Sequence, residues 1–232
     1  MQITNTEIYG FEASLRGMRN PLNSWHLQDS KYLYEYENNL KELKLMSDKL
    51  KSFSDIEDLK SESYVIGEND LGLAKRLIKA GTEHCKFLRQ IQVWADFDMP
   101  LYWWSEFDTY KFNTKNSCST MHKLFNAKKG IELSDFVFSE EEKPVLTFII
   151  GELNSLREKY LQTKDVNYLV RGKRLLPASF KQKRTVNTNY AELMNIYNQR
   201  KHHRLKEEWQ EVFCKWCESL PYFADFLEAK GK

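Results

Sequence analysis

The chain has 232 residues, of which 41% are hydrophobic and 29% charged, with nine Gly and five Pro. A chain of this length and composition can bury a sizeable core, which excludes a disordered or fibrous protein. Its net charge of +2 is too small for a protein whose whole body binds nucleic acid. Residues 1–18 are too polar for a signal peptide and the longest apolar run, residues 145–150, cannot span a membrane, so a cytoplasmic protein is expected.

The first half of the chain predicts strands and helices in alternation. Residues 2–9 can pair as a strand and residues 11–18 form a short helix, after which Pro21 interrupts regular structure. Residues 31–53 carry an imperfect helical stripe of Leu, Tyr and Met, and residues 54–68 are expected to be a polar connection. A clearer helix follows, with Asn69 or Asp70 as its N-cap and Gly81 closing it.

A change of period marks the next strand. Between residues 87 and 97 apolar side chains fall mainly at every second position, whereas the intervening positions include two Gln residues. This alternation predicts a strand with one partly polar face, a sign of a cleft. Pro100 suits the first turn of a helix over residues 101–111.

The second half is predicted to be mostly helical. A helix begins near Ser139, tolerates Pro144 in its first turn and continues to about Tyr160. Residues 171–187 are expected to be a basic connector. Further helices are predicted from about Thr188 and from about residue 205 to Pro221. With no repeat or linker, the simplest organisation is a single α+β domain over residues 1–232.

The segment after the predicted strand, residues 103–122 (WWSEFDTYKFNTKNSCSTMH), mixes bulky aromatics with charged and hydroxyl side chains. Such a mixture leaving the end of a strand is typical of a ligand site. Glu106 and Asp108 lie about 200° apart on a helix, so they cannot act together as acid and base there.

Other candidate groups allow more than one interpretation. His84 suits a hydrogen-bonded structural group or a catalyst. The basic residues 200–206, with Lys181, Lys183 and Arg184, suit a solvated helix face, a phosphate site or a duplex-binding surface. Cys214-Lys-Trp-Cys217 resembles half of a zinc site or a redox pair, but its aromatic flanks have helical spacing and predict a structural position. No metal site is expected, and no common nucleotide-loop or hydrolase motif occurs.

One pattern near the end of the chain is specific. Thr185-Val-Asn187 and residues 189–200 (NYAELMNIYNQR) resemble the C-terminal signature of the flavin-dependent thymidylate synthases, the ThyX family. That signature has an Asn, a second Asn six residues on and an Arg five residues later, and Asn189, Asn195 and Arg200 keep both intervals. The likeness is closer to remote, viral or phage branches than to ordinary members.

Weaker likenesses cover most of the chain. Residues 71–84 with the following strand are similar to the family's helix, Glu-His turn and long strand, and residues 116–119 resemble the end of its central RHRxxSxNxxSxR motif. The opening aromatic segment occupies the place of that motif, but no RHR triplet exists and Met121 stands where an Arg would meet a phosphate. Lys111, Lys123 or Arg200 would have to supply the missing positive charge.

The resemblance implies a homotetrameric α+β protein with a central antiparallel sheet, flanking helices and a bound FAD. It implies one-carbon transfer to C5 of a pyrimidine nucleotide of the uracil type, with reduced nicotinamide and methylene-tetrahydrofolate as co-substrates. The roles it implies are flavin binding by His84, Asn189 and Asn195, nucleotide binding by Asn116, Arg200, Lys111 and Tyr110, and a place near the reacting base for Ser119. Trp103, Trp104 and Tyr110 are expected to line the pocket.

Two alternatives remain open. A scaffold without its phosphate-binding arginines could hold a nucleotide, a flavin or another partner without turning it over. A nucleic-acid binder using residues 200–206 is the third hypothesis, and it predicts an affinity for DNA that falls steeply with salt.

Overall fold

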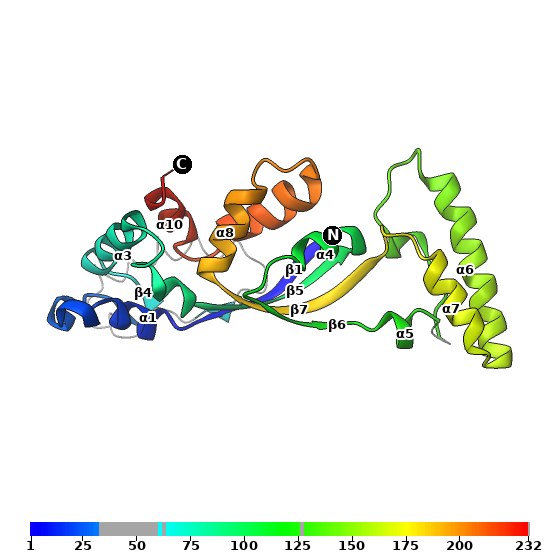
Figure 1. Ribbon diagram of the computed structural model, residues 1–232, viewed down its shortest axis with the longest axis horizontal. Coiled ribbons are helices and arrows are strands. Elements are labelled where there is room, and N and C mark those ends of the chain that lie inside the picture. Colours follow the sequence, from blue (N-terminus) through cyan, green and yellow to red (C-terminus); the bar gives the residue numbers. More distant parts are fainter. Residues whose placement is uncertain (33–59, 62–63, 126–127, 232) are drawn as a thin grey trace, which may run out of the picture. The chain divides into compact units, whose positions relative to one another are not determined.

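The computed structural model describes residues 1–32, 60–61, 64–125 and 128–231 (Figure 1). The predicted helix over residues 31–53 therefore lies almost wholly outside the described residues. The strands are β1 (Gln2–Tyr9), β2 (Lys31–Tyr32), β3 (Lys60–Ser61), β4 (Tyr64–Val65), β5 (Gln92–Pro100), β6 (Thr114–Ser117) and β7 (Lys181–Asn189). The helices are α1 (Phe11–Met18), α3 (Glu68–Ala80), α4 (Leu101–Phe107), α5 (Thr120–Lys123), α6 (Lys143–Thr163), α7 (Val166–Leu175), α8 (Tyr190–Arg200), α9 (Lys215–Ser219) and α10 (Phe223–Ala229).

The strands form a five-stranded sheet in the order β3-β1-β5-β7-β6 and a small antiparallel pair, β2-β4. The larger sheet is antiparallel, as predicted, apart from the parallel pairing of β1 with β3. By its contacts the chain divides into two compact units. The first unit holds residues 1–2, 97–109 and 116–185, and the second holds residues 3–96, 110–115 and 186–232. The single domain over residues 1–232 therefore stays a prediction.

Most predicted elements are confirmed. β1, α1, α3 with its closing Gly81, and α6 with Pro144 in its first turn all form where expected. Residues 86–89 form a 3₁₀ turn instead of a strand, so β5 begins only at Gln92. A π-helix, Lys206–Cys214, precedes α9.

The predicted basic connector over residues 171–187 is wrong. Its first part is the end of α7, and its last part is most of β7. Val186 and Thr188 are buried on one face of β7, whereas Lys183 and Thr185 are exposed. Because charged residues occupy much of this strand, its period-two pattern does not stand out in the sequence.

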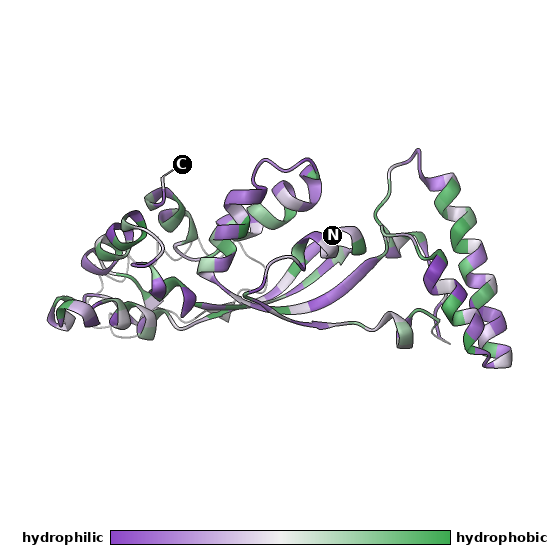
Figure 2. Cartoon of the chain, viewed as in Figure 1, coloured by the Kyte–Doolittle hydropathy of each residue, from purple (hydrophilic) through white to green (hydrophobic). Residues whose placement is uncertain are grey.

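The first unit contains a helical hairpin of α6 and α7. Hydrophobic and hydrophilic residues alternate along α6 in Figure 2. Its buried side includes Leu146, Leu153 and Leu156. On α7, Gly172 lies directly against Phe125, where an added Cβ would come within 2.3 Å of the ring. Only glycine fits this contact without a shift of the ring, since interiors are closely packed.

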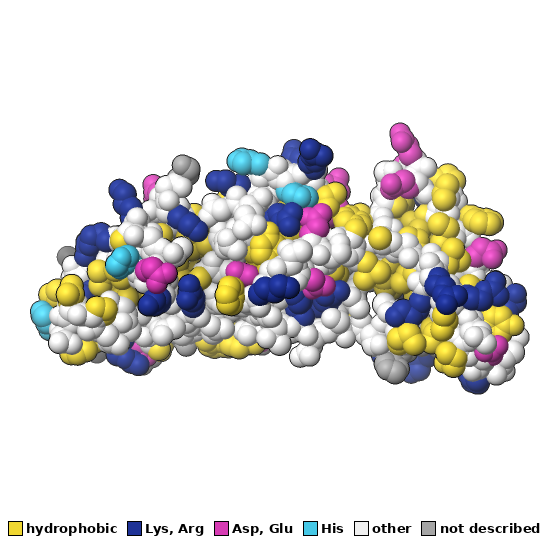
Figure 3. Space-filling model, viewed as in Figure 1, with side chains coloured by type: hydrophobic (Ala, Val, Ile, Leu, Met, Phe, Trp, Pro, Cys, Tyr) yellow, Lys and Arg dark blue, Asp and Glu magenta, His cyan; other side chains and the backbone are white. Residues whose placement is uncertain are grey.

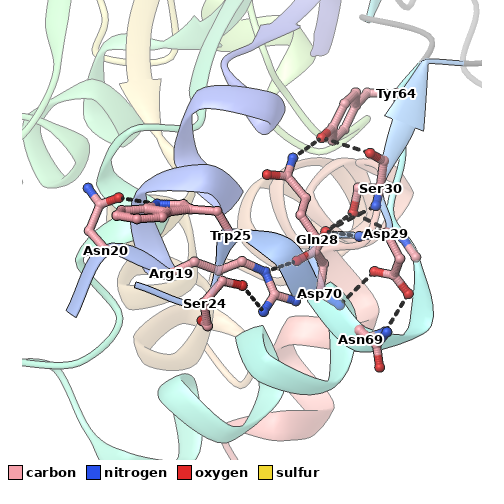
Figure 4. Close-up of polar contacts among 11 residues, drawn as sticks. Arg19, Asn20, Ser24, Trp25, Gln28, Asp29, Ser30, Tyr64, Asn69 and Asp70 are labelled. Atoms are coloured by element: carbon pink, nitrogen blue, oxygen red, sulfur yellow. Dashed lines mark hydrogen bonds and ion pairs between the residues drawn. The ribbon is translucent and has the colours of Figure 1, made fainter. Parts of the chain in front are cut away.

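In the second unit a buried ion pair joins the end of α1 to the start of α3 (Figure 4). Arg19 Nε lies 2.6 Å from Asp70 Oδ1, and the two side chains are only 3% and 0% exposed. The other carboxylate oxygen of Asp70 accepts hydrogen bonds from the Ser30 backbone N–H (3.1 Å) and hydroxyl (2.5 Å). A buried charge is tolerated only when it is paired and hydrogen-bonded, and Asp70 meets both conditions.

The N-terminus of α3 is capped from outside the helix. Asp29 accepts hydrogen bonds from the backbone N–H groups of Asn69 (2.8 Å) and Asp70 (3.0 Å). The prediction that Asn69 or Asp70 is the N-cap is therefore wrong, because Asp29 satisfies the first free N–H groups of the helix. The ion pair and this cap together fix α3, which forms part of the candidate site.

We expect Arg19→Met to lower the free energy of unfolding by about 3–5 kcal/mol, because it leaves the Asp70 carboxylate buried without its cation. Arg16→Met is the matched control on the same helix. It breaks an exposed contact with Glu12 of 3.6 Å, so it should change stability little. Urea unfolding followed by circular dichroism measures both variants, and equal losses would contradict a special contribution from the buried pair.

Candidate functional site

A cavity of about 410 Å³ lies in the second unit, between the end of α3 and the start of α8. Apolar side chains such as Ile78, Leu88 and Met194 line much of it, and a few polar groups converge on the same space. A mostly apolar cavity with few polar groups is the usual form of a small-molecule site. Asn189 and Asn195, both expected to bind a cofactor, line it.

The two asparagines present the same chemistry to the cavity. Asn189 caps α8, and its Oδ1 accepts the backbone N–H of Glu192 at 3.1 Å. Asn195 lies one and a half turns into the helix, and its Oδ1 accepts Gln199 Nε2 at 3.0 Å. Because each oxygen already accepts one hydrogen bond within the protein, we expect the Nδ2 groups to be the main donors to a ligand.

Arg200 and Tyr110 connect to Asn195 through Gln199. Arg200 Nε donates to Tyr110 Oη at 2.8 Å, and Tyr110 Oη donates to Gln199 Oε1 at 3.1 Å. The Arg200 guanidinium also lies 4.6 Å from the ring centre of Trp209, in the π-helix, and 5.6 Å from that of Tyr110. Three of the residues selected from the sequence therefore belong to one hydrogen-bonded chain.

Phe112 adds an exposed ring to the cavity wall. Its side chain is 72% exposed, although its backbone is fixed at both ends. Its N–H donates to Glu192 Oε1 at 3.4 Å, and its carbonyl accepts the Thr188 hydroxyl at 3.2 Å. An aromatic ring held in solvent beside a cavity is suited to cover a flat ligand. No spacing or motif in the sequence marks this residue.

Cationic side chains surround the same cavity. Lys79, Arg89 and Lys230 line it together with Glu192, and Lys79 and Lys230 also line a neighbouring hollow of about 330 Å³ together with Lys75, Arg76 and Glu228. Lys75 is paired with Asp225 at 2.8 Å, so it contributes less to the positive charge than the others. Such a group can balance the charge of a phosphate. The sequence predicts Arg89 in a strand, whereas it lies in the 3₁₀ turn of residues 86–89. For this reason the sequence did not indicate it as a site residue. The basic residues 200–206 lie at the end of α8 and just beyond it, where Figure 3 shows Lys, Arg and His side chains at the surface.

The other expected site residues lie elsewhere. His84 is exposed and lines a different cavity of about 410 Å³, beside Leu77 and Phe87. Lys111 is exposed next to Tyr110. Asn116, on β6, and Ser119, before α5, belong to the first unit. Their expected contacts with a nucleotide stay predictions.

The two tryptophans expected to line the pocket are buried in the core of the first unit. Trp103 and Trp104 are 0% and 1% exposed. The Trp103 ring stacks on that of Phe107 at 4.8 Å, and Phe97 from β5 packs against both tryptophans. That expectation is wrong, because a crowded aromatic segment is used here as core.

The two acidic residues of this segment do not form an acid-base pair. Asp108 accepts two hydrogen bonds of 3.1 Å from Arg184, whose guanidinium lies 4.2 Å from the ring centre of Trp104. Both bonds come from the one nitrogen Nη1, whereas Nε donates to Gln182 Oε1 at 3.0 Å. The planar stacking on Trp104 is the feature that suits Arg rather than Lys. Arg184 therefore binds the end of α4 through Asp108. It is not part of the cationic group around residues 200–206 that the sequence predicts.

Cys214 and Cys217 are buried, at 4% and 0% exposure. Burial raises the pKa of the Cys214 thiol to about 12 and that of Cys217 well above its ordinary value. Among the residues that the structure describes, no three His, Cys, Asp or Glu side chains are grouped to hold a metal ion. The burial of both thiols agrees with a structural position for the CxxC segment.

No helix in the described part of the chain combines the length and apolar character needed to cross a membrane.

Comparisons with known proteins identify the fold. No protein-family model and no curated protein sequence matches the chain. A crystal structure of the flavin-dependent thymidylate synthase ThyX from Helicobacter pylori, complexed with FAD and dUMP, matches 98% of this chain and 97% of its own, with a TM-score of 0.63 and 15% identity. A second ThyX structure from Helicobacter pylori, also with FAD and dUMP, matches 100% of both chains, with a TM-score of 0.67 and 14% identity.

A third structure is the UMP/dUMP methylase PolB from Streptomyces cacaoi, bound with 5-Br UMP. It matches 71% of this chain and 84% of its own, with a TM-score of 0.50 and 14% identity. The chain therefore has the fold of the flavin-dependent thymidylate synthases, which confirms the α+β class expected from its sequence.

The buried thiols give a prediction on pH. At pH 8 we expect Ellman's reagent to modify Cys118, which is exposed, and Cys85, which is half-buried, long before Cys214 and Cys217. Because folding raises the thiol pKa values of Cys214 and Cys217, their contribution to stability is complete below the unfolded pKa of about 8.5 and is lost as pH rises above it.

Urea unfolding between pH 8 and pH 11 measures this loss, and Cys214→Ala should reduce the slope. Cys118→Ala is the control and should leave the slope unchanged. Rapid reaction of all four thiols in the folded protein would contradict the assignment.

Proposed function

We propose that this chain is a flavin-dependent enzyme that binds FAD in the cavity beside α8 and transfers a one-carbon group to C5 of a uracil-type nucleotide. The observation that supports this most directly is the meeting of Asn189 and Asn195 at one cavity wall with both Nδ2 groups available. The structural neighbours bound to dUMP or 5-Br UMP support a pyrimidine nucleotide as substrate.

The cavity residues fit an isoalloxazine ring. The ring is flat, apolar on its faces and rich in acceptors along one edge, so it can accept hydrogen bonds from Asn189 and Asn195 while Phe112 covers one face. Apolar residues such as Leu88 and Met194 would exclude water from it. A bound, reduced flavin supplies the hydride equivalents that one-carbon transfer of this kind requires.

The cationic residues fit the diphosphate of FAD. Lys79 and Lys230 face both the cavity and the neighbouring hollow, so a dinucleotide could continue from one to the other. They would balance the negative charge of the diphosphate, for which this chain has no RHR triplet. Ser119 and Asn116 remain our candidates for contacts with the nucleotide, and reduced nicotinamide and methylene-tetrahydrofolate our candidate co-substrates.

A homotetramer remains our expectation for the assembly. The molar mass measured by light scattering should then be four times the 27.7 kDa of one chain.

The alternative is a binding protein that holds a flavin or nucleotide on the same scaffold without turning it over. The absence of an RHR triplet favours it, because the family's phosphate-binding arginines are missing from residues 103–122. FAD binding without consumption of a uracil nucleotide would support this alternative. DNA binding through residues 200–206 is less well supported, since Arg200 is engaged with Tyr110 and Trp209.

The first prediction concerns the two amides. Asn189→Asp and Asn195→Asp keep the accepting oxygen, and with it the cap of α8, but remove the NH₂ donor. Each variant should bind FAD about tenfold more weakly, because each loses one hydrogen bond to the ring. Asn198→Asp is the matched control, since Asn198 lies on the same helix and bonds to Met194 O instead.

Titration of FAD with the apoprotein, followed by flavin fluorescence and by absorbance near 450 nm, gives the affinities. A wild-type chain that does not bind FAD would refute the proposed function.

A second prediction tests Phe112. Trp quenches flavin fluorescence on contact by electron transfer, so Phe112→Trp should quench bound FAD more strongly than wild type, whereas Phe148→Trp should not. Phe148 is the control because it is equally exposed, at 70% against 72%, but lies on α6. Equal quenching by both variants, or none by either, would show that Phe112 does not cover the ring.

A further inference from the structure

We propose that Arg200 is a positioning residue, which fixes through Tyr110 and Gln199 the side of the Asn195 amide that faces the cavity. The proposed orientation of Asn195 concerns the protein alone. Its effect on a ligand rests on the proposed function. Direct contact of Arg200 with a nucleotide stays a prediction, and in the structure its Nε donates to Tyr110 Oη.

Each hydrogen bond in this chain has a defined direction in the structure, and chemistry alone fixes the first. A guanidinium has only donors, so Tyr110 Oη must accept from Arg200 Nε, at 2.8 Å. In the structure the single phenolic proton of Tyr110 is directed to Gln199 Oε1, 3.1 Å away. The Gln199 amide therefore turns its Nε2 group to Asn195.

The last step decides the chemistry of the cavity wall. Asn195 receives a hydrogen bond from Gln199, so its Oδ1 is used at 3.0 Å and its NH₂ group is presented to the ligand. Without this chain the amide could rotate and present either group, because the two ends have nearly the same shape. The chain thus specifies a donor at this position.

The beginning of the chain is the rigid part. Arg200 lies over Trp209, which is 0% exposed, and beside Tyr110, which is 8% exposed. The backbone carbonyl of Tyr110 accepts a further hydrogen bond of 3.0 Å from Asn113. Gln199 and Asn195 are exposed, so packing does not fix their orientation. The hydrogen bonds that begin at the packed rings of Tyr110 and Trp209 fix it instead.

The helix geometry explains why a relay is needed. Asn195 and Gln199 are four residues apart and share one face of α8, whereas Arg200 is five residues from Asn195 and points about 140° away. Asn189, whose oxygen caps α8, presents its NH₂ group as well. The site therefore favours a ligand with two acceptors on one edge, and disfavours one that must donate there.

A double-mutant cycle tests the relay. Tyr110→Phe removes the phenolic oxygen but keeps the ring under Arg200, and it should weaken FAD binding by no more than Asn195→Ala, for which we expect roughly tenfold. Because both act through one group, the double variant should bind no more weakly than the worse single variant. Independent, multiplying effects would overturn the relay.

The control uses a tyrosine of α8 itself. Tyr197 bonds to Glu218 rather than to Gln199, so Tyr197→Phe alone should leave both the FAD affinity and the Asn195 NH₂ signal unchanged.

A measurement without ligand separates the relay from the proposed function. In protein labelled with ¹⁵N-asparagine, Asn195→Ala identifies the Asn195 side-chain NH₂ signal, and Tyr110→Phe should shift it. Gln199→Glu keeps the size of the side chain but has no donor, so Asn195 should turn its NH₂ toward the new carboxylate and present Oδ1 to the cavity. Its NH₂ signal should then move downfield, and FAD affinity should fall as in Tyr110→Phe.

The outcomes are distinguishable. If wild-type protein fails to bind FAD but the NH₂ signal responds as expected, the proposed function fails and the relay stands. If FAD binds and neither the signal nor the affinity responds to Tyr110→Phe, the relay fails and the proposed function stands.

Discussion

The hydrogen bond from the Glu192 backbone to Asn189 Oδ1 is the contact on which the candidate site depends. It ends β7 and begins α8 at one residue, so the helix starts at the cavity wall with a fixed rotation. The rotation places Asn195 at the cavity and directs Arg200 toward Trp209. A helix that began one residue later would turn each of these groups by about 100°.

The opposite wall depends on a separate set of contacts. Asp29 caps α3, and Asp70, in the first turn of that helix, is paired with Arg19 at the end of α1. The residues at the far end of α3, Ile78 and Lys79, contribute to the cavity. A buried charge cluster at one end of a helix therefore supports a binding surface at its other end, because the helix transmits position as a rigid body.

Local signals were sufficient for much of this structure. The breakers and periodicity of α1, α3, α6 and α8 act over a few residues, and the intervals between Asn189, Asn195 and Arg200 could be recognised directly. The sequence could not show contacts between distant segments. Asp29 caps a helix forty residues on, and Tyr110 meets Gln199 at a separation of 89 residues. Trp103 and Trp104 show the same limit, because composition indicates aromatic crowding but not whether the rings face a ligand or the core.

The π-helix between Lys206 and Cys214 carries Trp209, the ring on which Arg200 lies. Such a helix forms i→i+5 hydrogen bonds, one residue more per turn than an α-helix, and is frequent at functional sites. We expect the loss of a single residue there to favour α-helical bonding and to turn the indole away from the guanidinium, without replacing any cavity-lining residue. Variation in length at this distant segment would thus alter ligand preference, so natural relatives that differ by one residue here are expected to differ in what they bind.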